Sequence, residues 1–300
     1  MQSAGRNTLW LLIILAGAGA LIVWLFPVKD IDVPQDSTLP RIVTLSPAIA
    51  VILDDLGLSE QIVGRHAYDI VLDSSVPIVG DMTGIDYERL LRLRPTHILL
   101  EHNAQPLPER LQLLADDNGW MIRSMPMLTL EDIPLATEQL TQLFESPQTR
   151  ERLMTLLDNF NSSMQPSLDA SGRAGRVLPL YWTNPPGAAG PGSFHHQMLE
   201  RLGFEMALTD GGAYITVDPE DILRMDPDSI LLLMPGADSQ RLDELLGPLQ
   251  KLDLRCVREG RVGVINDPMV NLPATSIIEI AKEITRITLL WAPPTPIEAN

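Results

Sequence analysis

Cysteine is almost absent from the sequence, since Cys256 is the only one among 300 residues. A single cysteine cannot form a disulfide within the chain, and it excludes every metal site that needs several cysteine ligands. Cys256 lies in the stretch LRCVREGRV, where we expect it to pack in the interior rather than to react as a thiol.

Basic residues are also few. The chain has 22 lysine and arginine residues against 39 aspartate and glutamate residues, which gives a formal charge of −17. A protein that binds nucleic acid neutralises phosphates with clustered lysine and arginine side chains, and the sequence has no such cluster. We therefore expect no nucleic-acid partner. With 45% hydrophobic residues, the chain can still bury a substantial core.

The motifs of common catalytic sites are missing as well. The sequence contains no Walker loop, no dinucleotide fingerprint after its first predicted strand, no G-x-S-x-G elbow and no H-E-x-x-H pair. Ser46 follows a predicted strand as a nucleophile would, but Pro47 comes next and spacing assigns no histidine partner. We therefore expect a protein that is not an enzyme, with no catalytic residue and no cofactor.

A long hydrophobic run, residues 9–27, lies near the start of the chain. As a helix rising about 1.5 Å per residue, its apolar part would cover about 27 Å of hydrocarbon. Arg6 precedes the run and acidic residues follow it, so we expect residues 1–8 in the cytoplasm and the rest of the chain outside. The run predicts a single-pass signal anchor in the inner membrane, with residues 28–40 as a linker to a soluble periplasmic domain.

A cleaved signal peptide is the alternative for this run, because Ala18-Gly19-Ala20 offers a small-residue cleavage pattern. Cleavage there would leave an exposed apolar terminus, which favours the uncleaved anchor. No cysteine directly follows the run, and this excludes a bacterial lipoprotein anchor.

After the linker, short apolar runs alternate with helical patterns, which is typical of an α/β fold with mainly parallel sheet. We expect two Rossmann-like lobes at residues 41–145 and 173–291. A long spine helix at 146–172 should join them, and the tail 292–300 should be disordered. Within the lobes, the stretch Glu88–His102 resembles the stretch Glu220–Gly236, because each reads as a helix, a proline and a buried strand. This indicates an internal repeat of one supersecondary unit.

Four segments together resemble the periplasmic binding proteins that deliver iron siderophores, haem or cobalamin to ABC importers. They are RIVTLSPAIAVILDDLGLSEQIVGR, VGDMTGIDYERLLRLRPTHILLE, GPGSFHHQMLERLG and REGRVGVINDPM, and they occur in the order expected for that family. The resemblance implies two lobes joined by a helix, with a ligand held between them and little hinge closure. It also implies an ABC importer permease as partner and a small metal chelate as ligand.

Candidate ligand-binding residues are those in loops after predicted strands, because the carboxyl ends of parallel strands gather along one edge of a sheet. We expect the Pro/Gly-rich stretch Tyr181–His196 to form one lip of the site, with glycine amides close to the ligand and an anion at the helix that Ser193 begins. Aromatic side chains would offer flat faces to a chelate. The expected ligand-binding residues are Ser46, His66, Tyr68, Met82, His102, Trp182, Ser193, Tyr214 and Asn266.

The histidines allow a second interpretation. His97 lies inside a predicted strand and is expected to be structural, whereas His66 and His102 follow strands. A weak alternative is therefore a divalent-metal site built from His66, His102, His195 and Asp267, with His196 as a substitute for His195. The sequence flanking these residues does not resemble the metal-binding branch of the family, so the main prediction has no metal site.

Docking to a permease is a further implication of the resemblance. In the cobalamin-binding relatives, one glutamate of each lobe pairs with arginine pockets on the transporter. Glu88 matches the glutamate of the first lobe. The matching position in the second lobe is Gln197, so Glu200, three residues later on the same helical face, is the candidate. The uncharged Gln197 leaves open a ligand-sensing or interaction domain that serves no importer.

Overall fold

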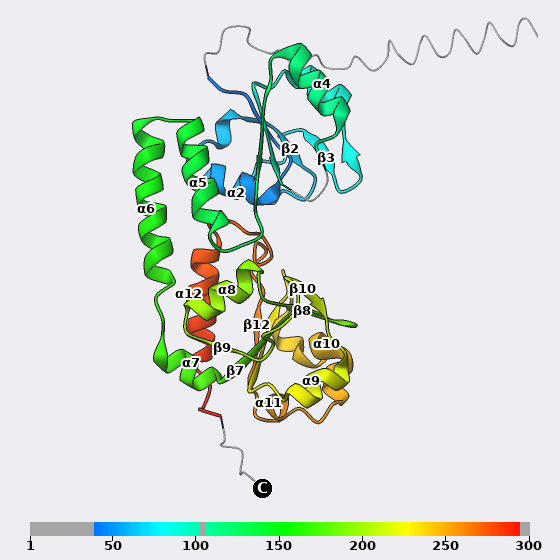
Figure 1. Ribbon diagram of the computed structural model, residues 1–300, viewed down its shortest axis with the longest axis vertical. Helices are drawn as coiled ribbons and strands as arrows, with labels where there is room; N and C mark the ends of the chain where they lie inside the picture. Colours follow the sequence, from blue (N-terminus) through cyan, green and yellow to red (C-terminus); the bar gives the residue numbers. More distant parts are fainter. Residues whose placement is uncertain (1–38, 103–105, 295–300) are drawn as a thin grey trace, which may run out of the picture. The chain divides into compact units, whose positions relative to one another are not determined.

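The computed structural model describes residues 39–102 and 106–294 (Figure 1). The predicted cytoplasmic segment, the anchor, nearly all of the linker and the end of the tail lie outside these residues, as do residues 103–105 of one candidate loop. Within the described ranges, no helix combines the length and the apolar character needed to cross a membrane.

The N-terminal half forms a six-stranded sheet in the order β4-β3-β2-β1-β5-β6, parallel except for the β3–β4 hairpin. Its strands are β1 (Ile42–Thr44), β2 (Ile62–His66), β3 (Ile78–Asp81), β4 (Gly84–Ile85), β5 (His97–Glu101) and β6 (Met121–Met125). Its helices are α2 (Pro47–Asp55), η1 (Ser59–Gln61), α3 (Tyr87–Leu93) and α4 (Glu109–Asn118). The predicted alternation of strands and helices is confirmed here, including Asp86 as the N-cap of α3.

The C-terminal half forms a second sheet in the order β10-β8-β7-β11-β12, with β9 beside β7. Its strands are β7 (Arg176–Thr183), β8 (Pro186–Ala189), β9 (Glu205–Met206), β10 (Tyr214–Thr216), β11 (Ser229–Leu233) and β12 (Val262–Ile265). Its helices are α8 (Phe194–Arg201), α9 (Pro219–Met225), η2 (Ser239–Arg241), α10 (Leu242–Leu246), η3 (Gly247–Lys251) and α11 (Arg255–Arg258). Because β8 is antiparallel to both β7 and β10, the expectation of a mainly parallel sheet was wrong at this edge.

The predicted internal repeat is confirmed in backbone detail. The pair α3–β5 corresponds to the pair α9–β11, and each helix ends on a left-handed residue that is not glycine: Arg94, with φ 44°, and Asp226, with φ 41°. A proline follows each of them. Left-handed backbone is uncommon outside glycine, so its occurrence at two equivalent positions indicates that one local fold occurs twice.

An arginine at the start of a neighbouring strand holds each of these turns. Arg41 Nη2 donates at 2.8 Å to the carbonyl of the last residue of α3, and Arg176 Nη2 donates at 2.7 Å to the carbonyl of the residue that caps α9. The backbone N–H groups of the same two arginines donate to Thr96 Oγ1 and to Asp228 Oδ2, both at 2.8 Å. The repeat therefore includes the contacts that fasten each helix–strand turn to its sheet.

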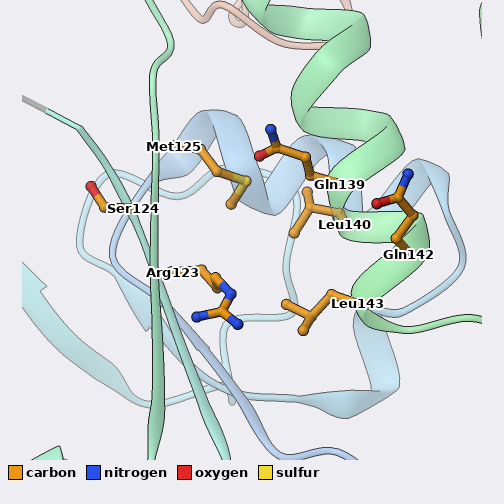
Figure 2. A pocket seen from close by; sticks show the side chains of 7 residues that line it. All are labelled: Arg123, Ser124, Met125, Gln139, Leu140, Gln142 and Leu143. Carbon is orange, nitrogen blue, oxygen red and sulfur yellow. The ribbon is translucent and has the colours of Figure 1, made fainter.

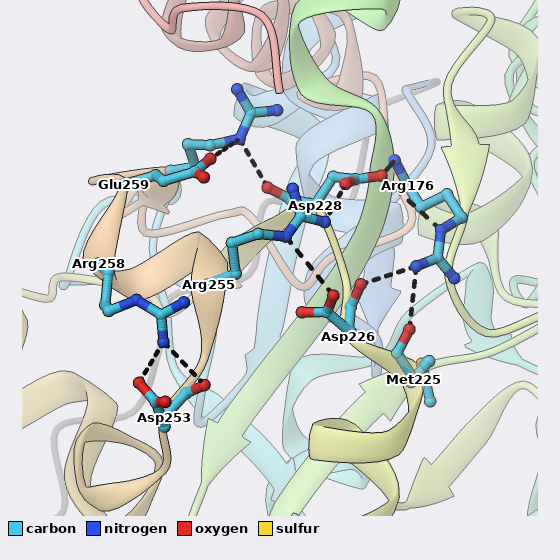
Figure 3. A network of polar contacts seen from close by, with 9 residues as sticks. Arg176, Met225, Asp226, Asp228, Asp253, Arg255, Arg258 and Glu259 are labelled. Atoms are coloured by element: carbon cyan, nitrogen blue, oxygen red, sulfur yellow. Dashed lines mark hydrogen bonds and ion pairs between the residues drawn. The ribbon is translucent and has the colours of Figure 1, made fainter. Parts of the chain in front are cut away.

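In the C-terminal copy this turn carries a network of charged groups (Figure 3). Asp228 Oδ1 accepts from Arg255 Nη2 at 2.5 Å, and both side chains are 15% exposed. Burial opposes ionisation of Asp228, but the N–H of Arg176 and the guanidinium of Arg255 outweigh it and lower the pKa of this carboxyl. Arg261 is buried and donates to the carbonyls of Asp228, at 2.7 Å, and of Ala292. The network thus joins β7, β11, α11 and the end of the described chain.

The helices between and after the sheets are α5 (Asp132–Leu143), α6 (Pro147–Ser163), α7 (Leu168–Ala174) and α12 (Ile277–Thr288). The prediction of one long spine helix at 146–172 was wrong, because α6 ends at Ser163 and α7 begins at Leu168, with Pro166 between them. Helix α6 packs on α5 and α12 (Figure 1). Ser146 begins α6 with a capping box: Thr149 N donates to Ser146 Oγ at 3.1 Å, and Ser146 N donates to Thr149 Oγ1 at 2.9 Å.

Replacing Ser146 by alanine is expected to lower the free energy of unfolding by about 1 kcal/mol, because Thr149 N, in the first turn of α6, loses its acceptor Ser146 Oγ. Urea denaturation followed by circular dichroism measures the change. Ser162→Ala, an exposed serine near the other end of α6, is the control and should change stability by less than about 0.5 kcal/mol. Equal effects of the two substitutions would contradict the role of the cap.

Three segments contribute side chains to the apolar cores of both lobes. Helix α5 places Ile133 in the C-terminal core and Leu140 in the N-terminal core. Leu156 of α6 packs against both cores. The segment after β12 places Val270 in the C-terminal core and Ala274 in the N-terminal core. The two lobes are therefore joined by shared packing as well as by the chain.

Candidate functional site

The carboxyl edge of the first sheet is organised around Ser46, which follows β1. Ser46 is 2% exposed, and its Oγ accepts from Ile49 N at 3.1 Å as the N-cap of α2. The same Oγ donates to Glu101 Oε1 at 2.5 Å. Because β1 and β5 are neighbours in the sheet, this hydrogen bond joins the ends of two central strands.

Sequence reasoning does not single out Glu101, because the candidate loop begins at His102. The available signal is a carboxylate directly after the buried run HILL, at the point where a strand reaches the edge of its sheet. The proximity of Glu101 to Ser46 depends on the pairing of β1 with β5, which the sequence alone does not give. Glu101 therefore joins the candidate site from the structure.

The neighbouring strand β2 ends at His66, and Tyr68 lies two residues later. His66 is 7% exposed, whereas Tyr68 is 64% exposed. Tyr68 N donates to His66 Nδ1 at 3.2 Å, which places the proton of the neutral imidazole on Nε2. Burial lowers the pKa of His66, although the carboxylates of Asp81, Glu101 and Asp69 act in the opposite direction. His66 is therefore neutral at pH 7, and Tyr68 presents its ring to solvent.

The β3–β4 hairpin presents Met82, which is 81% exposed. Asp81 Oδ1 accepts from the N–H groups of Thr83, at 2.7 Å, and of Gly84, at 3.2 Å, and these bonds fix the turn. Hydrogen bonds from the Thr83 hydroxyl and N–H lower the pKa of Asp81. The hairpin thus combines an exposed thioether with an ionised carboxylate.

Strands β7 and β10 of the second sheet carry an exposed aromatic pair, Trp182 and Tyr214, which we call the aromatic surface. Trp182 is 49% exposed and Tyr214 is 58% exposed. Trp182 is paired with Gly187 across β7 and β8, and a Cβ on Gly187 would lie 2.2 Å from the indole ring. The indole therefore lies across this glycine. The ring of buried Tyr181 is 5.7 Å from that of Trp182 and 5.6 Å from that of Tyr214.

The glycines of the Pro/Gly-rich stretch are explained by the sheet. A Cβ on Gly190 would lie 2.2 Å from the carbonyl oxygen of Gly212, and Gly190 N donates to Ala213 O at 3.0 Å. Gly187 makes room for Trp182 in the same way. The Gly190 amide is therefore bonded within the second lobe rather than available to a ligand.

Ser193 has no exposed surface. Its Oγ donates to Gly190 O at 2.9 Å and accepts from His196 N at 3.2 Å, and Phe194 N donates to Leu128 O at 3.0 Å. These amides at the start of α8 have protein partners. Ser193 is thus a helix cap, and the site proposed below does not include it.

His195 is completely buried. Because a carbonyl only accepts, Nε2–H donates to Val270 O at 2.7 Å, and Nδ1 accepts from the Tyr181 hydroxyl at 3.0 Å. Burial lowers the pKa of His195 to about 4, against a smaller opposing effect of the bond to Val270. Both ring nitrogens are occupied, so His195 cannot ligate a metal without losing one of these bonds.

Because of His195, we expect the free energy of unfolding to depend on pH. The unfolded state binds the imidazole proton near pH 6.5 and the folded state only near pH 4, so the unfolded state holds more protons between these values. The free energy of unfolding should therefore fall by about 3 kcal/mol as the pH drops from 6.5 to 4. Urea denaturation at several pH values measures it.

His195→Asn should be less stable at pH 7 but should lose most of this slope, whereas His102→Asn, at an exposed position, should keep it. The same slope in all three proteins would show that His195 is not its source.

The alternative metal site is not supported. Among residues 39–102 and 106–294, no group of three or more histidine, cysteine, aspartate or glutamate side chains could hold a metal ion. His102 is exposed, and Asp267 Oδ1 accepts from Met269 N at 2.7 Å. His97 packs edge-on against Phe144, with ring centroids 4.9 Å apart, as expected for a structural histidine.

Asn266 lies at the carboxyl edge of the second sheet, directly after β12, and is exposed. Its Nδ2 donates to Ala237 O at 2.9 Å, which ties this loop to the loop after β11. The side-chain oxygen of Asn266 belongs to a residue exposed at this edge.

Electrostatics connects the two carboxyl edges. Burial raises the pKa of Tyr214, and the Glu101 carboxylate raises it further, although the two residues belong to different sheets. The chain segment after β6 also contacts the second lobe, since Leu130 N donates to Gln197 Oε1 at 2.7 Å. In turn, Thr275, in the segment after β12, donates its Oγ1 hydroxyl to Asp55 at the end of α2 in the first lobe. Tyr214 and Glu101 therefore lie within electrostatic range of each other.

A separate pocket of about 340 Å³ lies between β6 and α5 (Figure 2). It is lined by Arg123, Ser124, Met125, Gln139, Leu140, Gln142 and Leu143. None of these residues belongs to the candidate loops, and the pocket has no part in the site described above.

Comparisons with known proteins place the chain among binding proteins of one kind. The family described as periplasmic binding protein matches residues 42–267. No curated protein sequence matches this chain significantly.

Several solved structures share the fold. They include the periplasmic vitamin B12 binding protein BtuF of Vibrio cholerae (TM-score 0.68, 18% identity, covering 84% of this chain and 98% of that one). The periplasmic heme binding protein HutB of the same organism is similar (TM-score 0.67, 18% identity, 83% and 98% covered). So is its siderophore binding protein FhuD, bound to Fe3+–Desferal (TM-score 0.64, 19% identity, 85% and 100% covered).

Proposed function

Because the chain belongs to the family of periplasmic binding proteins, we propose that it captures a metal chelate, such as a ferric siderophore, haem or cobalamin, for an ABC importer. The ligand would bind between the carboxyl edges of the two sheets. Solved structures of the same fold carry vitamin B12, heme and siderophore binding in their names. This supports the ligand class.

The observation that carries the proposal is the set of exposed aromatic rings at both edges. Tyr68 extends from the first sheet, and the aromatic surface, Trp182 and Tyr214, extends from the second. Flat rings suit a macrocycle or a chelator, because they bury a large area with few rotatable bonds. The exposed thioether of Met82 adds a further apolar contact at the first edge.

The internal repeat changes the proposed docking residues. Glu88 is the second residue of α3, and the repeat places Glu220 at the second position of α9, where it is also exposed. Gln197 is unsuited to docking because its Oε1 accepts from Leu130 N, and Glu200 lies 3.4 Å from His196 Nδ1. We therefore propose Glu88 and Glu220, rather than Glu88 and Glu200, as the pair that docks on a permease.

This pair also bears on the alternative of a sensing domain without an importer. That alternative depended on the lack of a charged residue at the second docking position. Glu220 supplies the charge, so the importer is the better-supported partner. Tethering by residues 9–27 stays part of the proposal, since it would keep the captured ligand near the permease.

Isothermal titration calorimetry with the purified full chain tests the proposal. The titrants are haem, vitamin B12, Fe3+–Desferal and zinc chloride. We expect one chelate to bind with a Kd of about 1 µM or tighter and zinc to give no comparable heat. If no chelate binds, or if zinc alone binds at that affinity, the proposed function is wrong.

A further inference from the structure

The charged residues of the candidate loops are all acidic. Neither lysine nor arginine occurs in the loops that follow the strands at the two carboxyl edges, whereas several of these loops contain an aspartate. They are HAYD (66–69), DMTGI (81–85), His102, WTNPPGAAGPGS (182–193), GGAY (211–214), PGAD (235–238) and NDPMVN (266–271). A ligand held here meets carboxylates without a matching cation from the same loops.

Glu101, directly before the loop after β5, is a further carboxylate held in place at this edge. It ends the central strand β5, it is half-buried, and its Oε1 accepts from Ser46 Oγ at 2.5 Å. Ser46 is itself held as the cap of α2. A charge whose position is fixed by a neutral hydroxyl keeps its full effect on a neighbouring ligand, because no counter-charge in that contact cancels it.

The neighbouring groups do not neutralise this edge. The carboxylates of Asp81, Glu101 and Asp69 all act on His66, yet burial keeps the imidazole neutral at pH 7. Arg65, in β2, is cationic, but its Nε donates to Val76 O at 2.9 Å and its charge acts on Asp73, in the loop after β2, rather than forming an ion pair with Glu101. The negative charge therefore remains at the edge that faces Tyr214.

We propose that Glu101 selects the ligand by charge: the site takes a chelate that presents a neutral or cationic group to the first sheet and discriminates against one that presents a carboxylate there. This inference rests on the proposed function and narrows it. A carboxylate placed near Glu101 in a partly buried site would be repelled, whereas an ammonium or an amide would be accepted.

Matched pairs of chelates, which share the same metal centre and differ in their number of free carboxylates, test the inference. The pairs are Fe3+–Desferal and its N-succinyl derivative, vitamin B12 and a monocarboxylate made by hydrolysis of one side-chain amide, and haem dimethyl ester and haem. Each is titrated into the full chain at low salt. For the pair that binds, the member without the added carboxylate should bind at least about 10-fold more tightly.

Glu101→Gln removes the charge and keeps the shape, and should reduce this preference to about 3-fold or less. Glu151→Gln, at an exposed position on α6, is the matched control and should leave the preference unchanged. Equal or tighter binding of the carboxylated member, or an unchanged preference in Glu101→Gln, refutes the inference while the proposed function stands. A lack of binding by all six compounds refutes the proposed function, and the inference with it.

Discussion

Replacing Asp228 by alanine is expected to lower the free energy of unfolding by about 3–5 kcal/mol. In the folded protein, Asp228 accepts from the guanidinium of Arg255 and from the backbone N–H of Arg176, and its side chain is only 15% exposed. Removing it takes the closest acceptor from both donors, while the positive charge of Arg255 stays in a mostly buried place. Urea or thermal denaturation of the full chain measures the loss.

The internal repeat supplies the control for this substitution. Thr96 occupies the equivalent position in the first lobe and accepts from Arg41 N at 2.8 Å, but it is exposed and uncharged. Thr96→Ala should therefore cost only about 1 kcal/mol. If Asp228→Ala and Thr96→Ala lower the free energy of unfolding by the same amount, the charged network contributes nothing to stability beyond the backbone contact that both lobes share.

The Asp228 contribution should also depend on pH. Burial opposes its ionisation, but the Arg176 and Arg255 contacts lower the pKa of this carboxyl below its unfolded value. The stabilisation is thus fully present above about pH 4 and is lost as the pH falls through the folded pKa. The stabilities of the natural protein and Asp228→Asn should converge in acid. A constant difference between pH 7 and pH 2 would contradict this explanation.

Replacing Trp182 by alanine is expected to weaken binding of the chelate about 30-fold, as is typical for an aromatic residue that dominates a binding surface. Because the indole is about half exposed and lies on the face of β7 and β8, stability should change by less than about 1.5 kcal/mol. Calorimetric titration gives the affinity, and urea denaturation shows that the variant is folded.

Gly187→Ala tests the position of the indole without removing it. The added methyl group would lie 2.2 Å from the ring, so Trp182 must leave its place across the strand. Affinity should then fall to a value between those of the natural protein and Trp182→Ala. Leu168→Ala, at an 84% exposed position on α7, is the control and should bind normally. Unchanged affinity in Trp182→Ala would remove the aromatic surface from the site.

Much of the fold could be predicted from local signals. Apolar runs bounded by proline give β5 and β11, and Asp86 marks the start of α3, because caps and buried strands depend on residues close in sequence. Strand β8 could not be predicted in this way. Its sequence, PGAA, has the composition of a turn, and it forms a strand only because β7 and β10 pair with it on either side.

The candidate site shows the same division. Tyr68 and Met82 follow strands, Trp182 is the penultimate residue of β7 and Tyr214 begins β10, and the structure leaves all four exposed. Ser193 and His195 had equally suitable positions in the sequence, but they are buried by packing of α8 on the second lobe. Glu101 needed the order of the strands in the sheet, which depends on contacts distant in sequence.

The side chains that α5, α6 and the segment after β12 give to both cores have a consequence for cooperativity. Neither lobe can lose its core without exposing apolar groups of the other, because Leu156 packs against both. The two halves should therefore melt in a single calorimetric transition, and a chain cut between them should yield no independently stable half.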